Sequence, residues 1–165
     1  MAENFRAISI GEMIVSNASE DVLVAYGLGS CVAICLYDPV AKVGGMLHAL
    51  LPQANNQAKD NSAPAKFVDS GLPLLLRSIT YQKGERNRLT VYVCGGAQLI
   101  SAPNFSDMLK IGQRNIAAAQ AALQNAGLTI KGQDVGGNAG RTVKLHIDTG
   151  HITVKSLGQG ERRLI

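Results

Sequence analysis

The sequence contains no tryptophan among its 165 residues, and aromatic residues make up only 4% of it. Proteins that hold single-stranded nucleic acid rely on aromatic side chains on which the bases stack. The net charge is +4, but the basic residues are scattered, which is more typical of a solvated surface than of a nucleic-acid patch. We therefore expect no nucleic-acid partner, while attraction to an acidic protein partner stays open.

Long apolar runs are also missing. None approaches the ~20 residues that a membrane-spanning helix needs, and the first stretch, MAENFRAISIGEMIVSN, lacks the charged start and continuous apolar core of a secretory signal. The three cysteines, Cys31, Cys35 and Cys94, form no CxxC pair, which argues against a zinc site. We expect a cytoplasmic protein with reduced thiols, without membrane insertion and without a metal.

The common cofactor motifs are incomplete. Gly27 and Gly29 lack the third glycine of a dinucleotide fingerprint, and the sequence has no P-loop lysine. His146 and His151 flank the turn DTG and are better interpreted as solvated residues than as metal ligands. We therefore expect no cofactor.

What the sequence does contain is typical of one globular α/β domain over residues 1–165. Hydrophobic residues make up 46% of it and charged residues 17%. Alternating or β-branched runs predict several strands, among them 31–38, 43–52, 88–97 and the closing hairpin 141–157. Two helices are expected, one from the apolar stripe between Val68 and Ile79 and one from the alanine-rich run 111–127, which ends at Gly127.

The stretch AYGLGSCVAICLYDP, residues 25–39, places a thiol at a glycine corner. The turn DPVAK then folds the strand 43–52 back, so that Cys31 comes near residues 48 and 49. If Cys31 stands opposite His48, the two side chains share a face with Cβ atoms ~5 Å apart. A register one position different turns His48 away, unless a bulge at the glycine pair 44–45 restores the shared face.

Two interpretations of this pair stay open at the level of spacing. A thiolate beside an imidazole is a minimal covalent catalyst, and backbone N–H groups of GLGSC, around Gly29 and Ser30, could hold an oxyanion. Alternatively, Cys31 is a core thiol and His48 a hydrogen-bonded core histidine. Spacing alone favours the second interpretation, because a lone cysteine and a lone histidine are common.

Several longer motifs decide between the two. They are GLGSCVAICLYDPVAKVGGMLHALLP, KFVDSGLPLLL, GGAQLI, IGQRNIAAAQAALQNAGL and DVGGNAGRTVKLHIDTGHITVK, followed by GQGE near the end. Together and in this order they resemble the CheD family, the chemoreceptor glutamine deamidases of bacterial and archaeal chemotaxis. The resemblance covers nearly the entire chain, and it favours the catalytic interpretation of Cys31 and His48.

The resemblance implies an α/β sandwich with mixed or antiparallel sheets that converts selected glutamines on chemoreceptor cytoplasmic helices to glutamate. Some members are also credited with methylesterase action on receptor methyl esters. The family's nucleophile falls on Cys31 and its general base on His48. The family's third residue, a threonine six positions before the cysteine, is replaced here by Ala25. Ala25 has no side-chain acceptor to orient the imidazole. A backbone carbonyl at or near Ala25 could substitute, so we expect reduced or differently tuned activity rather than complete loss.

The resemblance also implies a protein partner, the CheC-type phosphatase. A second function is therefore a non-catalytic or weakly catalytic regulator of that phosphatase. The substitution at Ala25 favours this alternative, whereas the retained Cys31 and His48 disfavour it.

Overall fold

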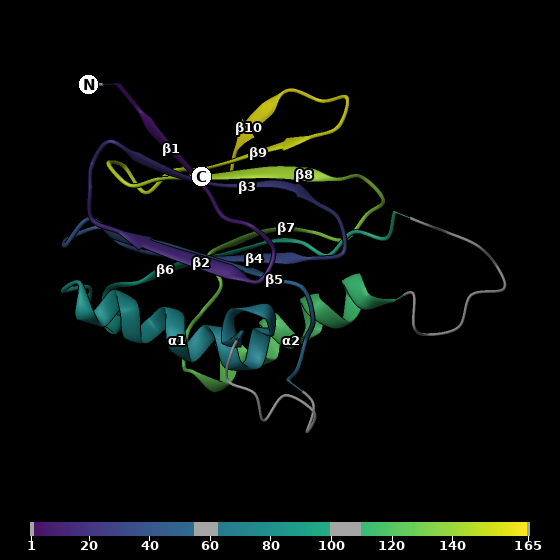
Figure 1. Cartoon of the computed structure of the whole chain (residues 1–165), viewed down its shortest axis with the longest axis horizontal. Coiled ribbons are helices and arrows are strands. Elements are labelled where there is room, and N and C mark those ends of the chain that lie inside the picture. Colours follow the sequence, from purple (N-terminus) through teal and green to yellow (C-terminus); the bar gives the residue numbers. More distant parts are fainter. Residues whose placement is uncertain (1, 55–62, 100–109, 165) are drawn as a thin grey trace, which may run out of the picture.

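Two stacked β-sheets and a layer of two helices make up the domain (Figure 1). The computed structural model describes residues 2–54, 63–99 and 110–164. The two sheets and the helix layer form an α/β sandwich, which confirms the fold class expected from the sequence. The helices cover only one of the two sheets, so that the layers follow the order sheet, sheet, helices (Figure 1).

The outer sheet, sheet A, has the strand order β1-β3-β8-β9-β10. Strands β1 and β3 pair in parallel, and the other neighbouring strands of this sheet pair antiparallel. Its strands are β1 (Asn4–Ala7), β3 (Asp21–Leu28), β8 (Arg141–His146), β9 (Ile152–Ser156) and β10 (Glu161–Arg163). The predicted closing hairpin is the pair β8–β9. The sheet is therefore mixed, as expected.

The central sheet, sheet B, has the order β2-β5-β4-β6-β7 and is also mixed, because β6 and β7 run parallel. Its strands are β2 (Glu12–Ser16), β5 (Val43–Ala49), β4 (Val32–Asp38), β6 (Thr90–Gly95) and β7 (Gly132–Val135). Every residue of β4 and β5 is buried. These two strands are buried on both faces because sheet A covers one side and the helices cover the other, which explains their nearly continuous apolar sequence.

The helix layer consists of α1 (Val68–Tyr81) and α2 (Ile111–Asn125), with short 3₁₀ turns at Pro64–Lys66 and Arg86–Arg88. Both long helices were predicted from the sequence, and α1 tolerates Pro73 inside it. In the part of the chain that the structure describes, no helix is long and apolar enough to cross a membrane.

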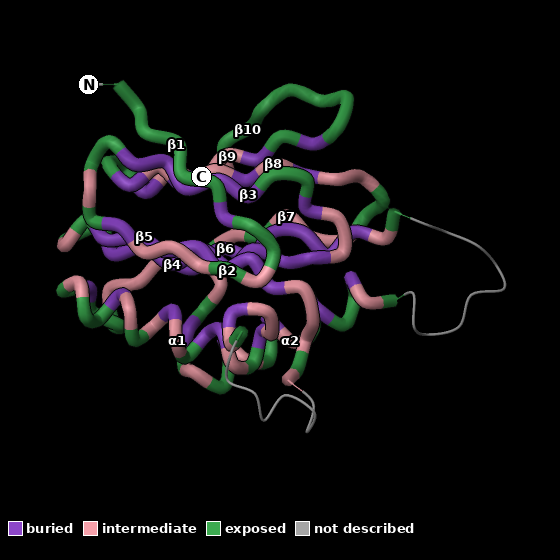
Figure 2. The backbone as a smooth tube through the Cα atoms, viewed as in Figure 1, coloured by how far each residue is buried: buried purple, intermediate pink, exposed green. Residues whose placement is uncertain are grey.

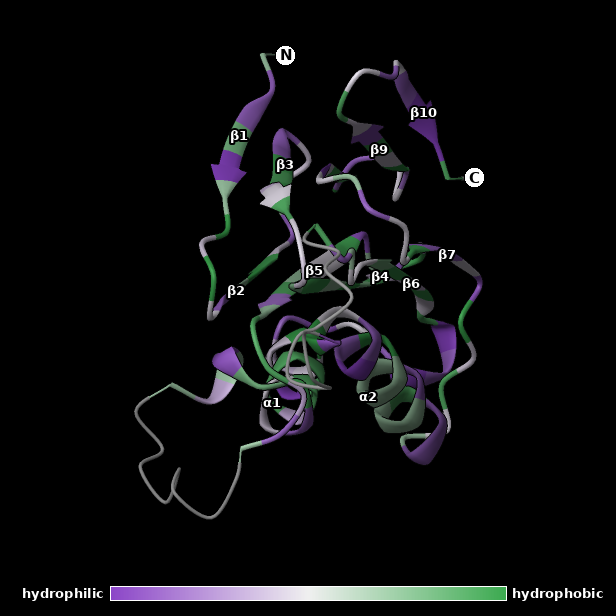
Figure 3. Cartoon of the chain, turned by 90° about the vertical axis from the view of Figure 1, so that its right-hand side faces the viewer, coloured by the Kyte–Doolittle hydropathy of each residue, from purple (hydrophilic) through white to green (hydrophobic). Residues whose placement is uncertain are grey.

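The interior is divided into two apolar cores, one on each side of sheet B. The first lies between the sheets and contains Cys31, Cys35 and Cys94, and the second lies between sheet B and the helices. Figure 2 shows the buried tube segments concentrated in the two sheets, and Figure 3 shows the helices beneath sheet B. The strands of sheet B therefore separate two packing layers, and a side chain's parity along a strand decides which layer it enters.

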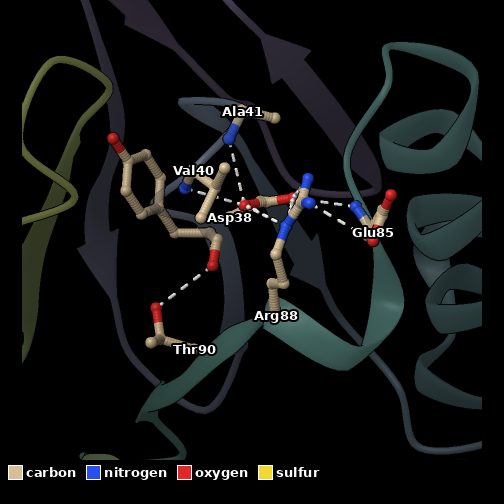
Figure 4. A network of polar contacts seen from close by, with 7 residues as sticks. Asp38, Val40, Ala41, Glu85, Arg88 and Thr90 are labelled. Atoms are coloured by element: carbon tan, nitrogen blue, oxygen red, sulfur yellow. Dashed lines mark hydrogen bonds and ion pairs between the residues drawn. The ribbon is translucent and has the colours of Figure 1, made fainter.

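A buried carboxylate fixes the turn between β4 and β5 (Figure 4). The side chain of Asp38 is fully buried and accepts hydrogen bonds from the backbone N–H groups of Val40, Ala41 and Glu85 at 2.8–3.1 Å. The guanidinium of Arg88 donates to both of its oxygens at 2.8–3.1 Å. These donors lower the pKa of Asp38 to about 2 against the opposing effect of burial. The carboxylate therefore joins the hairpin turn to the segment that leads into β6.

Candidate active site

Cys31 and His48 lie on the same face of sheet B. Cys31 directly precedes β4, and the β4–β5 register pairs Ala33 with His48, two positions from a direct Cys31–His48 pairing. Because side chains alternate between faces with a period of two, this shift keeps the thiol and the imidazole together as diagonal neighbours. The register is continuous through Gly44 and Gly45, so the bulge considered there is not needed.

The imidazole of His48 is held by a backbone carbonyl. Its side chain is buried, and its Nδ1 lies 2.9 Å from the carbonyl oxygen of Ile8. A carbonyl only accepts, so Nδ1 carries the hydrogen and Nε2 presents a lone pair. Within residues 2–54, 63–99 and 110–164, Nε2 has no hydrogen-bond partner. His48 thus has the tautomer and the free nitrogen of a general base.

Ala25 lies in β3, faces the core between the sheets and is fully buried. The orienting carbonyl does not come from Ala25 itself. It comes from Ile8, whose own N–H donates to the carbonyl of Val24 at 2.8 Å. The acceptor therefore lies directly after β1, the strand that pairs parallel with β3. This carbonyl belongs to a residue that the sequence did not single out.

The glycines before Cys31 shape the corner. The pairing of β3 with β8 shifts between Ala25 and Leu28, and Gly27 adopts a φ of 61° there. That left-handed conformation favours glycine, because a Cβ makes it strained. β3 ends after this irregularity at Leu28, and the chain passes from sheet A to sheet B, where Cys31 directly precedes β4.

Burial sets the resting charge of the pair. It raises the pKa of the Cys31 thiol, opposed by a hydrogen bond from the backbone N–H of Cys31 itself. It also lowers the pKa of His48, opposed by the hydrogen bond to Ile8 and by the charge of Glu12, which pairs with His48 across β2 and β5. At neutral pH the pair is therefore an uncharged thiol and a neutral imidazole.

The loop Gly29–Cys31 is fixed through its carbonyl groups. The carbonyl of Gly29 accepts from the N–H of Ala97 at 2.8 Å, and the carbonyl of Ser30 accepts from Nδ2 of Asn115 at 2.9 Å. In a planar trans peptide the C=O and the next N–H point in opposite directions. The N–H groups of Ser30 and Cys31 are therefore held facing away from these partners, as preorganised donors for an oxyanion have to be.

The other cysteines are poor candidates for chemistry. Cys35 and Cys94 are fully buried in the core between the sheets. Burial raises the pKa of Cys94 to about 12 and raises that of Cys35 well above its usual range. Among the described residues, no three histidine, cysteine or acidic side chains gather where they could hold a metal ion. Cys31 is also buried, but it keeps 6% exposure, whereas the other two thiols have none.

Comparison with known proteins agrees with the motifs. The family described as CheD chemotactic sensory transduction matches residues 50–156. A relative from Symbiobacterium thermophilum is 37% identical over 96% of both chains, and one from Pyrococcus abyssi is 42% identical over 93% of both. A third, from Syntrophomonas wolfei, is 43% identical over 86% of this chain and 88% of its own. Each of these relatives is named a probable chemoreceptor glutamine deamidase CheD.

The fold and the geometry define a two-sheet α/β domain with a thiol and an imidazole on its inter-sheet face. The chain belongs to the CheD family, as its motifs indicated. A solved structure, the Bacillus licheniformis hypothetical protein YfiH, aligns with a TM-score of 0.45 and 11% identity over 81% of this chain and 59% of its own, and it adds nothing to this assignment.

Proposed function

We propose that this protein is a cytoplasmic chemoreceptor glutamine deamidase in which Cys31 is the nucleophile and His48 the general base. The observation that carries the proposal is the state of His48: Nδ1 is bound to the Ile8 carbonyl while Nε2 is unpartnered among the described residues, on the face that Cys31 shares. The names of the relatives support the reaction and the substrate, a glutamine of a chemoreceptor.

The mechanism follows from these positions. As the thiol of Cys31 attacks the glutamine carboxamide carbon, its proton passes to Nε2 of His48, and the N–H groups of Ser30 and Cys31 receive the oxyanion. His48 then gives the proton to the departing nitrogen, so that the C–N bond breaks and ammonia leaves a thioester. Water attacks this thioester with His48 as base, the C–S bond breaks, and glutamate and the thiol are released. These steps need no cofactor.

The proposal is tested on a cognate receptor. The protein is incubated with the cytoplasmic fragment of a receptor encoded in the same genome, and the peptides are analysed by mass spectrometry. We expect specific glutamines to gain the mass difference between an amide and an acid, with Cys31→Ala as the inactive control. If no receptor fragment from the genome is converted, or if Cys31→Ala converts it equally well, the proposal is wrong.

The same chemistry extends to esters. The acyl thioester forms equally from a glutamate methyl ester, with methanol leaving in place of ammonia. Methylated receptor fragments in the same assay test this second activity. Release of methanol that depends on Cys31 supports methylesterase action, and retention of every methyl group excludes it.

The alternative function is regulation of a CheC-type phosphatase without catalysis. Two observations favour it: Ala25 offers the imidazole no side-chain acceptor, and burial raises the pKa of the Cys31 thiol. Cys31→Ala and His48→Ala separate the two functions. Phosphatase binding that survives in both variants, together with a wild-type protein that converts no glutamine, supports the alternative.

The pH dependence of kcat/KM gives a further prediction, because it reports the free enzyme. His48 acts only when neutral, and its pKa lies below 6.5, so activity should hold down to that pH and fall as the pH drops further. The thiol pKa lies above 9.0, so the fall in activity on the alkaline side should begin only beyond that value. The profile is measured by ammonia release between pH 5 and 10. An acid limb centred above 6.5 would contradict the assignment of His48.

A further inference from the structure

Asn115 occupies the gap where β4 and β5 separate. It lies in the second turn of α2 and its side chain is fully buried. The last ladder pair at this end is Val32 with Ala49, so Ser30 and Leu50 lie beyond the paired residues. Nδ2 of Asn115 donates to both of their carbonyl oxygens, each at 2.9 Å. One side-chain amide thus joins the loop of the nucleophile to the strand of the base.

Both hydrogens of this amide nitrogen are used, which fixes the orientation of the side chain. Oδ1 of Asn115, by contrast, is buried and unpartnered with respect to the residues that the structure describes. A buried acceptor without a donor is costly. The chain nevertheless keeps an amide at this position, where two carbonyl oxygens face the same point and would repel each other without a donor between them.

The helix that carries Asn115 also packs against the end of β6, which in turn binds the loop of Cys31. A Cβ on Gly112, at the start of α2, would lie 2.5 Å from the carbonyl oxygen of Gly96. Gly96 in turn donates its N–H to the carbonyl of Cys31 at 2.8 Å. The first turn of α2, the end of β6 and the loop of Cys31 are therefore in contact through backbone atoms, which leaves Asn115 little freedom to move. Figure 1 shows the start of α2 at the same end of the molecule as the corner between β3 and β4.

We propose that Asn115 is a positioning residue that holds the Cys31 loop against the strand of His48, so that the thiol can transfer its proton to Nε2. The inference rests on the proposed roles of Cys31 and His48. Because Leu50 is two residues from His48 and Ser30 adjoins Cys31, the bridge acts on both partners at once. Among the described residues, the nearest other backbone link between these two segments is the ladder pair Val32–Ala49, while Ala97 and Gly96 tie the loop to the end of β6.

The test measures the coupling of the pair apart from deamidation. Iodoacetamide alkylates thiolates; Cys31 keeps a small exposed fraction, whereas Cys35 and Cys94 have none, and the peptide modified at Cys31 is quantified by mass spectrometry. The readout is the alkylation rate near pH 7 divided by the rate near pH 10, because a base beside the thiol raises only the first. His48→Ala gives the value of an uncoupled thiol.

We expect Asn115→Ala to lower this ratio about tenfold, towards the value of His48→Ala, and Asn115→Ser, which keeps one donor, to lie between it and the wild type. Deamidation should show kcat reduced about 10- to 100-fold, as for a misplacement of the order of 1 Å, with KM changed less than about threefold. Leu123→Ala, on the same helix and buried in the helix-facing core, is the control for lost stability and should leave the ratio unchanged.

Three outcomes would overturn the inference. Asn115→Ala or Asn115→Ser could keep the wild-type ratio, Leu123→Ala could lower it by the same factor, or wild type and His48→Ala could have equal ratios. If Asn115→Ala does not fold, Asn115→Ser carries the test. A wild-type protein that deamidates no receptor, while the ratios follow the expected order, refutes the proposed function and leaves the positioning role of Asn115 supported.

Discussion

Replacing His48 by alanine is expected to slow receptor deamidation by about 10²–10⁴ at neutral pH, the range for loss of a positioned general base. The pKa of the Cys31 thiol is raised by burial. Without a base beside it, only a small fraction of the thiol is ionised at neutral pH. The same variant loses the proton donor for the departing ammonia. The measurement is the initial rate of Gln-to-Glu conversion by mass spectrometry.

The matched control for this variant is His48→Asn. Its Nδ2 can replace Nδ1 as the donor to the Ile8 carbonyl, but it offers no basic nitrogen at the position of Nε2. We therefore expect His48→Asn to be about as inactive as His48→Ala while recovering part of its lost stability. Activity of His48→Asn above about a tenth of the wild-type rate would show that His48 acts as a structural residue and not as a base.

The half of the site that lies in one hairpin could be predicted from the sequence. Cys31 and His48 are joined by a short turn, so counting residues brings them together, and the alternation of side chains leaves only the register open. The structure has a register two positions from direct pairing, which gives the same face. The turn itself is fixed by Asp38, a turn-forming residue that the sequence displays.

The other half depends on contacts between distant segments. Ile8 reaches His48 across 40 positions and Asn115 reaches Ser30 across 85. Ile8 acts through its backbone carbonyl, and a backbone group has no signature in the residue type. Asn115 sits inside an alanine-rich helix, where an asparagine is a weak helix former. That mismatch was the one signal for Asn115, and its partners follow only from the packing of α2 on sheet B.

The largest expected effect on stability comes from Asp38 and the polar contacts that Figure 4 shows around it. Asp38 lies at the end of β4 away from Cys31. Asp38→Ala removes a fully buried carboxylate, leaves the N–H of Glu85 without its acceptor and leaves the guanidinium of Arg88 paired with the exposed carboxylate of Glu85. Breaking a buried ion pair typically costs about 3–5 kcal/mol. Because the side chain of Arg88 is 29% exposed and can turn to water, we expect about 3 kcal/mol, measured by urea unfolding. Small domains have about 5–15 kcal/mol of stability in total, so this is a substantial fraction.

The pH dependence of stability gives Asp38 a second signature. Its folded pKa of about 2 lies below the ordinary value of 3.8, so its ionised form stabilises the folded state. The contribution is complete above pH 3.8 and is lost as the pH falls through about 2. Asp38→Ala should therefore differ from the wild type by the full amount near neutral pH and by less in acid.

The control for Asp38 is Asp148→Ala, which removes an exposed carboxylate 3.7 Å from Lys42. Exposed pairs contribute about 0–1 kcal/mol, so this variant should unfold close to the wild type. Because Asp38 and Cys31 lie at opposite ends of β4, folded Asp38→Ala should also retain the deamidation rate per folded molecule. Equal loss of stability in both variants would show that the buried Asp38 network stabilises the fold no more than an exposed ion pair does. A lower rate per folded molecule would mean that the hairpin turn transmits its order to the site, and that the two ends of β4 cannot be treated as independent.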